Sequence, residues 1–280
     1  MFAGNLFKLF AIVVLLACPN IVSSQEVSGK VTSDLPSPDE VVERYILAKG
    51  GYELLASISS SHIVWKYVDN GVEWTFERWT VPGQYYAERS RNGELDQTYG
   101  CWVAPKKSAA GKLAGVAWRK RMDREVYMKQ GVELQQTLVE SLFVDGSTRW
   151  SDRTKSVKCV AKKKMDDREC YQLKFVAHDG VETDRYFDVE TGYLRCTVTD
   201  ENGTGEKVTR KFANHKLIGD VVVAMKQTII SDTGTDVWEI QSFERDVDID
   251  IDRFELPEQV RFAINDQRSK TELAKDAGSP

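Results

Sequence analysis

Residues 63–78 read IVWKYVDNGVEWTFER, two runs of alternating side chains around an Asn-Gly pair. Asn70-Gly71 is a strong signal for a two-residue type I′ hairpin turn, because both residues tolerate the positive φ angles that this turn requires. A turn at this point sets three pairs of residues opposite each other: Tyr67 and Trp74, Trp65 and Phe76, Ile63 and Arg78. All six side chains then share one face, since side chains alternate along a strand with period two. The opposite face is largely polar.

Further turn signals divide most of the remaining chain into strands. A second Asn-Gly pair, Asn92-Gly93, predicts a hairpin that sets Arg89 against Asp96. From residue 154 almost to Pro257, strand-like runs alternate with short turn-forming pairs. We expect about eleven antiparallel strands, which is more than a flat sheet holds comfortably and implies a barrel or a sharply curled sheet.

Two long segments are expected to be helical, with a short helical turn between them from Tyr52 to Ala56. Ser37-Pro38-Asp39-Glu40 predicts a helix start, because serine can cap it, proline suits its first turn and glutamate completes a capping box. Between residues 119 and 143, leucines recur at helical spacing, which predicts a helix with an apolar stripe. The stripe consists of Leu134, Leu138 and Leu142, and it would form a lid if a ligand binds inside the barrel.

A basic group opens the second of these segments. It consists of Arg119, Lys120, Arg121 and Arg124. A solvated helix face is the ordinary interpretation of such a group, and contact with an anionic lipid surface or an acidic partner is the alternative.

The amino terminus predicts export. Residues 6–18 are an apolar run interrupted only by Lys8, about the length of a signal-peptide core and short for a bilayer span. Val22-Ser23-Ser24 fits a cleavage site, which makes residues 1–24 a signal peptide. Leu15-Leu16-Ala17-Cys18 fits a lipobox instead, in which Cys18 is lipidated and tethers the protein to the outer membrane. Both processing routes stay open, with an uncleaved anchor as a third alternative. Cleavage and lipidation each predict a periplasmic protein with no transmembrane span in the mature chain.

The rest of the chain divides simply. Residues 25–36 are a polar linker, 37–257 are predicted to form one domain, and 258–280 are polar and predict a flexible C-terminal tail. About 250 residues can bury a substantial core as one domain.

The net charge of −5 argues against nucleic acid as a main partner, because phosphate binding favours a basic surface.

The cysteines, histidines and acidic residues match no known catalytic or metal-binding motif. Cys159 and Cys170 flank a hairpin tip, which leaves a disulfide or two half-buried thiols as alternatives. The three histidines show no HExxH spacing, and no GxSxG elbow is present. Asp246 to Asp252 alternates acids with apolar residues, but Ile251 stands where an EF-hand loop needs glycine. We therefore expect no enzymatic activity, no metal site and no cofactor.

Several short motifs, taken in order, resemble the LolA-like superfamily of periplasmic lipoprotein carriers and outer-membrane lipoprotein-sorting proteins. They are Tyr45-Ile46-Leu47-Ala48-Lys49-Gly50-Gly51, Tyr99-Gly100-Cys101-Trp102, Arg185-Tyr186-Phe187-Asp188-Val189-Glu190-Thr191-Gly192-Tyr193-Leu194 and Phe254-Glu255-Leu256-Pro257. In the third motif Asp188 can cap the turn and Gly192 can take a positive φ. The resemblance implies a mainly β fold with helices (α+β), an incomplete antiparallel barrel closed by a helical lid around an apolar cavity for acyl chains.

These observations lead to two functional hypotheses. In the first, the protein binds lipids or lipoproteins and shelters their acyl chains in the barrel. Its ligand-binding residues would be Trp65, Tyr67, Trp74, Phe76, Arg78, Leu134, Leu138 and Leu142. In the second, the barrel is filled and the outer surface binds an envelope protein or senses envelope state. Arg78 must reach solvent, a carboxylate or a ligand head group, since an unpaired buried charge is costly.

Overall fold

A computed structural model of the protein describes residues 35–69, 71–93, 95–107, 113–121, 126–131, 133–134, 137–138, 154–177, 180–200 and 206–265. The predicted signal peptide and linker up to residue 34, including Cys18, lie outside this range, as do Arg124 and Leu142. None of the helices within it combines the length and apolar character that crossing a membrane requires.

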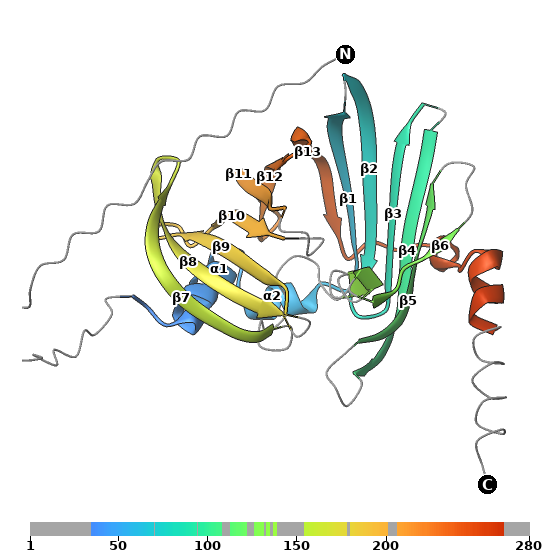
Figure 1. Ribbon diagram of the computed structural model, residues 1–280, viewed down its shortest axis with the longest axis horizontal. Coiled ribbons are helices and arrows are strands. Elements are labelled where there is room, and N and C mark those ends of the chain that lie inside the picture. The colour runs from blue at the N-terminus through green and yellow to red at the C-terminus, as the bar shows by residue number, and fades with distance from the viewer. Residues whose placement is uncertain are drawn as a thin grey trace, which may run out of the picture. The chain divides into compact units, whose positions relative to one another are not determined.

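The described chain is built around one antiparallel sheet (Figure 1). Its strands are β1 (Ser61–Asp69), β2 (Val72–Val81), β3 (Tyr85–Asn92), β4 (Leu95–Lys107), β5 (Leu113–Arg121), β6 (Tyr127–Met128), β7 (Thr154–Met165), β8 (Arg168–Ala177), β9 (Glu182–Asp188), β10 (Leu194–Thr199), β11 (Val208–Ile218), β12 (Val221–Ser231) and β13 (Gly234–Arg245). The helices are α1 (Pro38–Ala48), α2 (Tyr52–Ser57) and the 3-10 helix η2 (Ile251–Phe254).

The strand order is β6-β5-β4-β3-β2-β1-β13-β12-β11-β10-β9-β8-β7, so strands that follow each other in the chain are mostly neighbours in the sheet. The pairing of β1 with β13 joins the first strand to the last. Within the described residues the sheet does not close, and β6 and β7 form its two edges. The expected class, a mainly β incomplete barrel with helices, is confirmed, with thirteen strands in place of about eleven.

Helix α1 begins where the sequence predicts. The backbone N–H of Ser37 donates to Glu40 Oε2 at 2.7 Å, and Glu40 N–H donates back to Ser37 Oγ at 3.3 Å, which completes the capping box. Gly50, at φ 126°, ends the helix in close contact with the Asp220 carbonyl: a Cβ there would lie 2.6 Å from that oxygen. Helix α1 is therefore fixed against the β11–β12 turn.

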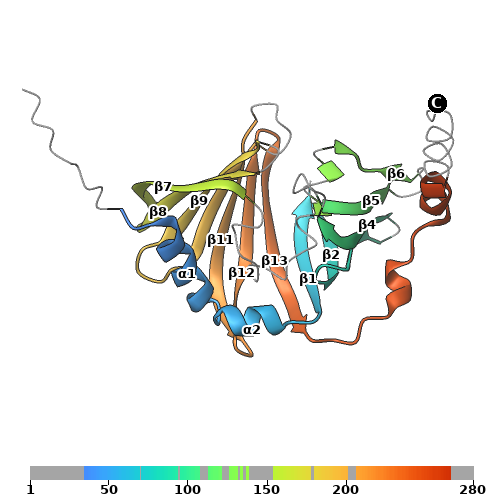
Figure 2. The same cartoon turned by 90° about the horizontal axis from the view of Figure 1, so that it is seen from below.

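The two helices cover one face of the sheet, which we call the inner face (Figure 2). Val41 and Val42 of α1 pack on Leu173, Phe175 and Phe187 of β8 and β9. Leu55 of α2 packs in a second cluster formed by β1, β2, β12 and β13. The core of the fold thus lies between the inner face and these helices.

The hairpin turn after β9 holds α1 in place. Asp188 Oδ1 accepts hydrogen bonds from the backbone N–H groups of Glu190 and Thr191, each at 2.9 Å, and Gly192 has a φ of 76°. Arg44 of α1 donates from Nη2 to the Val189 carbonyl at 2.7 Å. The cap and the glycine expected in this turn are both confirmed.

Three expectations are wrong. Arg119, Lys120 and Arg121 lie in strand β5, paired with β4, and not in a helix, because cross-strand pairing overrides their local helical pattern. Residues 258–265 form a helix in which Val260 is fully buried, so the predicted flexible tail does not begin at 258. The segment after β13 also leaves the sheet, and residues 251–254 form η2.

Of the two alternatives for Cys159 and Cys170, a disulfide or two thiols, the structure shows the thiols. Cys159 faces Leu173 and packs in the cluster under α1, whereas Cys170 faces Asp188 and packs with Tyr186 on the other side of the sheet. Side chains on opposite faces cannot be bridged without moving the backbone.

Candidate functional site

The predicted hairpin register is confirmed and places the expected site on the inner face. Tyr67 lies opposite Trp74, Trp65 opposite Phe76 and Ile63 opposite Arg78. Trp65, Trp74 and Phe76 are buried, while Tyr67 is half-buried. Alternation along two strands has therefore brought these side chains together as expected.

A residue far along the chain completes this group. Trp238 of β13 stacks on Tyr67 with ring centroids 4.1 Å apart and meets Phe76 edge-on at 5.1 Å. Trp65 meets Phe76 at 5.3 Å and Tyr67 stacks near Trp74 at 6.2 Å. We call these five residues the aromatic cluster. No local pattern predicts that Trp238 belongs to this cluster, because only the pairing of β1 with β13 brings it here.

The predicted lid lies on the same face but at another place. Residues 131, 133, 134, 137 and 138 are helical, and Leu138 is fully buried against Tyr86 and Ala117, with Leu134 beside it. Tyr86 and Ala117 belong to β3 and β5. Leu134 and Leu138 therefore cover the β3–β5 end of the inner face and pack in a different group from Trp65 and Phe76.

Arg78 reaches a carboxylate. It lies directly opposite Glu88 of β3, and its Nε and Nη2 donate to Glu88 Oε1 at 2.8 and 2.5 Å. Its guanidinium also lies 5.3 Å from the ring centroids of Trp65 and Tyr86. Of the three destinations expected for this charge, the carboxylate is the one observed.

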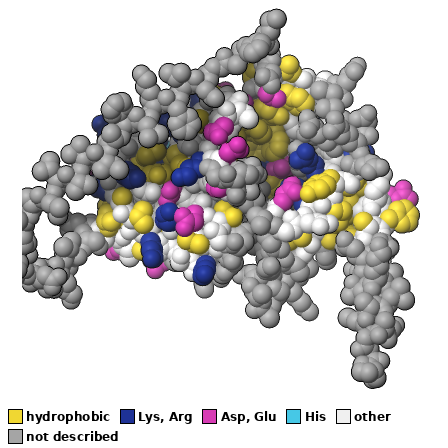
Figure 3. All heavy atoms as spheres, viewed as in Figure 1, with side chains coloured by type: hydrophobic (Ala, Val, Ile, Leu, Met, Phe, Trp, Pro, Cys, Tyr) yellow, Lys and Arg dark blue, Asp and Glu magenta, His cyan; other side chains and the backbone are white. Residues whose placement is uncertain are grey.

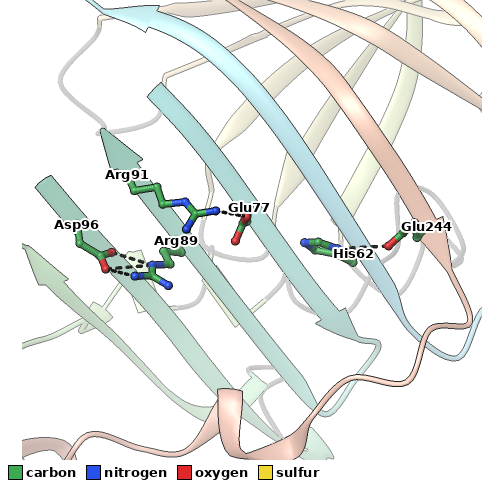
Figure 4. A network of polar contacts seen from close by, with 6 residues as sticks. All are labelled: His62, Glu77, Arg89, Arg91, Asp96 and Glu244. Atoms are coloured by element: carbon green, nitrogen blue, oxygen red, sulfur yellow. Dashed lines mark hydrogen bonds and ion pairs between the residues drawn. The ribbon is translucent and has the colours of Figure 1, made fainter. Parts of the chain in front are cut away.

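The other face of the sheet, the outer face, has a different character. Arg89 pairs with Asp96 at 2.5 Å, Arg91 with Glu77 at 3.0 Å and His62 with Glu244 at 3.5 Å, in a band across β4, β3, β2, β1 and β13 (Figure 4). Exposed ion pairs add little to stability, but they keep this face hydrated. The outer face therefore carries these polar pairs, together with a separate apolar cluster that contains Trp79, Ala87 and Phe254.

Figure 3 shows part of the hydrophobic surface of the protein. Hydrophobic side chains gather over the region where β13 and β1 run side by side (Figure 3). On the inner face of these two strands, Tyr67, Trp238 and Ile240 are only partly buried. This surface suits an apolar ligand, since transfer of apolar groups from water is favourable.

The described residues offer little for redox, metal or nucleophilic chemistry. They contain no cluster of three or more His, Cys, Asp or Glu side chains of the kind that could hold a metal ion. Burial raises the pKa of the Cys170 and Cys196 thiols to about 11, which keeps them protonated and unreactive near neutral pH. The inner face instead offers an apolar surface that contains a few polar groups, among them Arg78 and Glu88.

No protein-family model matches the sequence, and comparison with curated proteins finds no relative. Solved structures do match. A DUF1329 family protein from Desulfovibrio piger has 11% identity and a TM-score of 0.54 over 78% of this chain and 96% of its own. A domain assigned to outer membrane lipoprotein sorting from Vibrio parahaemolyticus has 10% identity and a TM-score of 0.51, covering 77% of this chain and 95% of its own.

A LolA superfamily protein from Nitrosomonas europaea is similar to the same degree. It has 8% identity and a TM-score of 0.51, and the match covers 79% of this chain and 99% of the other. At such identities the likeness concerns the fold. Together with the open antiparallel sheet and its helix-covered inner face, these matches show that the chain has a LolA-like fold.

Proposed function

We propose that this protein is a non-enzymatic lipid- or lipoprotein-binding module of the cell envelope, which holds acyl chains against its inner face. The observation that carries the proposal is the aromatic cluster, two of whose rings, Tyr67 and Trp238, are only partly buried. The aromatic cluster lies on the inner face, and the outer face carries ion pairs.

The fold and the amino terminus support this function. One structural neighbour is assigned to outer membrane lipoprotein sorting and another belongs to the LolA superfamily. The apolar run at residues 6–18 supports export to the periplasm, with Cys18 as a lipidation site or Ser24 as the end of a cleaved signal.

The free energy gained by burying one acyl chain is large enough to support binding. Each buried methylene contributes about 0.8 kcal/mol, so one chain of about sixteen carbons gains on the order of 10 kcal/mol before the costs of ordering. The aromatic cluster offers several rings for such contacts, two of which, Tyr67 and Trp238, are only partly buried.

Two tryptophans of one strand provide a matched test. Trp74 and Trp79 are 8% and 6% exposed, but Trp74 faces inward and Trp79 faces outward, where it stacks on His62. Trp74→Ala and Trp79→Ala should each lower the free energy of unfolding by about 3–5 kcal/mol. Only Trp74→Ala should also weaken displacement of a fluorescent fatty acid, measured at a temperature where circular dichroism shows both variants folded.

Native mass spectrometry of the gently purified protein gives a second readout that needs no variant. Bound lipid is expected, and it should be lost in the presence of a competing fatty acid. Wild-type protein that binds none of a range of fatty acids, phospholipids and acylated peptides would overturn the proposal. So would equal loss of binding in the two tryptophan variants at equal stability.

A further inference from the structure

We propose that the edge of strand β7 that faces away from β8 is a docking site for an acidic, extended segment of another protein, which would pair with β7 as an additional strand. This inference concerns a different part of the sheet from the aromatic cluster, and it does not depend on lipid binding. Three features of the edge carry it: its backbone groups, its exposed lysines and the apolar side chains beside them.

The backbone of β7 is available along one side. In the described part of the chain, β7 is the last strand of the sheet and pairs with β8 alone (Figure 1). A strand bonded on one side presents a row of N–H and C=O groups on the other side, to which an extended peptide can add. Twelve residues that rise about 3.4 Å each make this edge about 40 Å long. Main-chain hydrogen bonds along it can give affinity without a deep pocket.

The side chains of β7 give this edge a strong positive charge. The strand contains no acidic residue, and all of its lysines are exposed: Lys155, Lys158, Lys162, Lys163 and Lys164. Lys162 forms an ion pair with Glu169 of β8 at 2.8 Å, whereas the other four lysines pair with no carboxylate of the described residues. The whole chain has a net charge of −5, so the positive charge is local to this edge. A partner with complementary charge is therefore acidic.

The register divides these lysines between the two faces of the sheet. Lys163 lies opposite Cys170, which packs on the outer face, and Lys164 follows on the inner face. Lys158 lies between two residues that pack in the cluster under α1, so it points to the outer face as well. A flat anionic surface can contact the lysines of one face only, whereas a strand beside β7 has side chains on both faces. This arrangement favours a peptide over a membrane surface.

The inner side of the edge offers apolar contacts. Val157 and Cys159 pack in the cluster under α1, yet both are only half-buried. Apolar side chains on an added strand would cover them and bury further surface. A segment in which acids alternate with apolar residues therefore fits this edge. Its acids would lie beside Lys158 and Lys163 on the outer face, and its apolar residues beside Val157 and Cys159 on the inner face.

The test uses a twelve-residue peptide of alternating glutamate and valine, blocked at both ends, with binding measured by fluorescence anisotropy. We expect it to bind the wild-type protein at least tenfold more tightly than a peptide with glutamine in place of glutamate. N-methylation of its four central amides keeps the charge but blocks strand pairing, so that peptide should also bind at least tenfold more weakly. Saturating acidic peptide should slow hydrogen exchange of residues 154–165 at least fivefold and leave that of β1 unchanged.

Matched lysine variants separate this edge from general surface charge. Lys158→Gln/Lys163→Gln should weaken binding of the acidic peptide at least fivefold. Lys120→Gln/Lys216→Gln removes two exposed charges from β5 and β11 and should leave binding unchanged. Equal weakening in the two variants would overturn the docking site. Equal binding of the N-methylated peptide would overturn strand pairing, and equal binding of the glutamine peptide would overturn the recognition of charge.

Anionic vesicles decide between a protein segment and a membrane surface. Vesicles of phosphatidylglycerol that bind the wild type but not Lys158→Gln/Lys163→Gln, together with no binding of the acidic peptide, would overturn the assignment to a protein segment. Peptide binding that protects β7 from exchange would support it even in a protein that binds no lipid. Failure of the docking site and failure of the proposed function are therefore distinguishable.

Discussion

Arg78 and Glu88 face each other across β2 and β3 and form an ion pair inside an otherwise apolar region. The carboxylate is 14% exposed, and it accepts from Arg78 Nε at 2.8 Å, from Arg78 Nη2 at 2.5 Å and from the Tyr86 hydroxyl. A buried carboxylate with one strong cationic partner depends on that partner for its stability.

Replacing the arginine should therefore destabilise the fold. Arg78→Met leaves the Glu88 carboxylate without its cation, and we expect the free energy of unfolding in urea to fall by about 2 kcal/mol. Arg78→Met/Glu88→Gln removes both charges and should lose less than the single variant. If Arg78→Met unfolds at the wild-type urea concentration, the ion pair does not stabilise the fold. Lipid binding by this variant should stay within about twofold of wild type, because the Arg78 guanidinium is already paired with Glu88.

Asp188 should make the fold sensitive to acid. Burial disfavours its charge, but hydrogen bonds from the backbone N–H groups of Thr191 and Glu190 outweigh that effect and hold the pKa of Asp188 below its usual value. A lowered pKa in the folded state stabilises the protein above the ordinary aspartate pKa of about 3.9, and this stability is lost as the pH falls through the folded pKa.

The measurement is urea unfolding between pH 3 and pH 7. Asp188→Asn keeps a hydrogen-bond acceptor but removes the charge, so it should be less stable than wild type above pH 5 and approach wild type toward pH 3. Asp248→Asn, at an exposed position, serves as the control. A constant difference between wild type and Asp188→Asn at every pH would contradict the electrostatic explanation.

Cys170 and Cys196 should be resistant to chemical modification. Burial raises the pKa of Cys170 and Cys196 to about 11, and it raises that of Cys159 as well. With iodoacetamide at pH 8.5, peptide mass spectrometry should find Cys170 and Cys196 largely unlabelled in the folded protein and fully labelled in urea without reductant. A linked Cys159–Cys170 peptide would contradict the placement of these thiols on opposite faces.

Local chemistry predicted part of the fold well. The Asn70-Gly71 turn fixed the register of β1 and β2, and with it the shared face of Trp65, Trp74 and Phe76. The capping box of α1 and the turn capped by Asp188 were also predicted correctly, because each depends on residues only a few positions apart. The same reasoning gave a wrong register at Asn92-Gly93: Asn92 pairs with Leu95, and Asp96 lies opposite Arg91.

What the sequence did not reveal depends on contacts between distant segments. Trp238 joins the aromatic cluster only because β13 pairs with β1. Arg119 and Lys120 are in a strand because β4 supplies hydrogen bonds along them.

The open sheet leaves β7 at one edge, paired with β8 alone in the described part of the chain. Exposed edges of this kind can recruit the edge of another molecule and start fibril growth. Strand β7 reads TKSVKCVAKKKM, with five lysines. If the β7 edges of two molecules met side by side, their lysines would repel each other. This repulsion opposes aggregation at an edge that a closed barrel would lack.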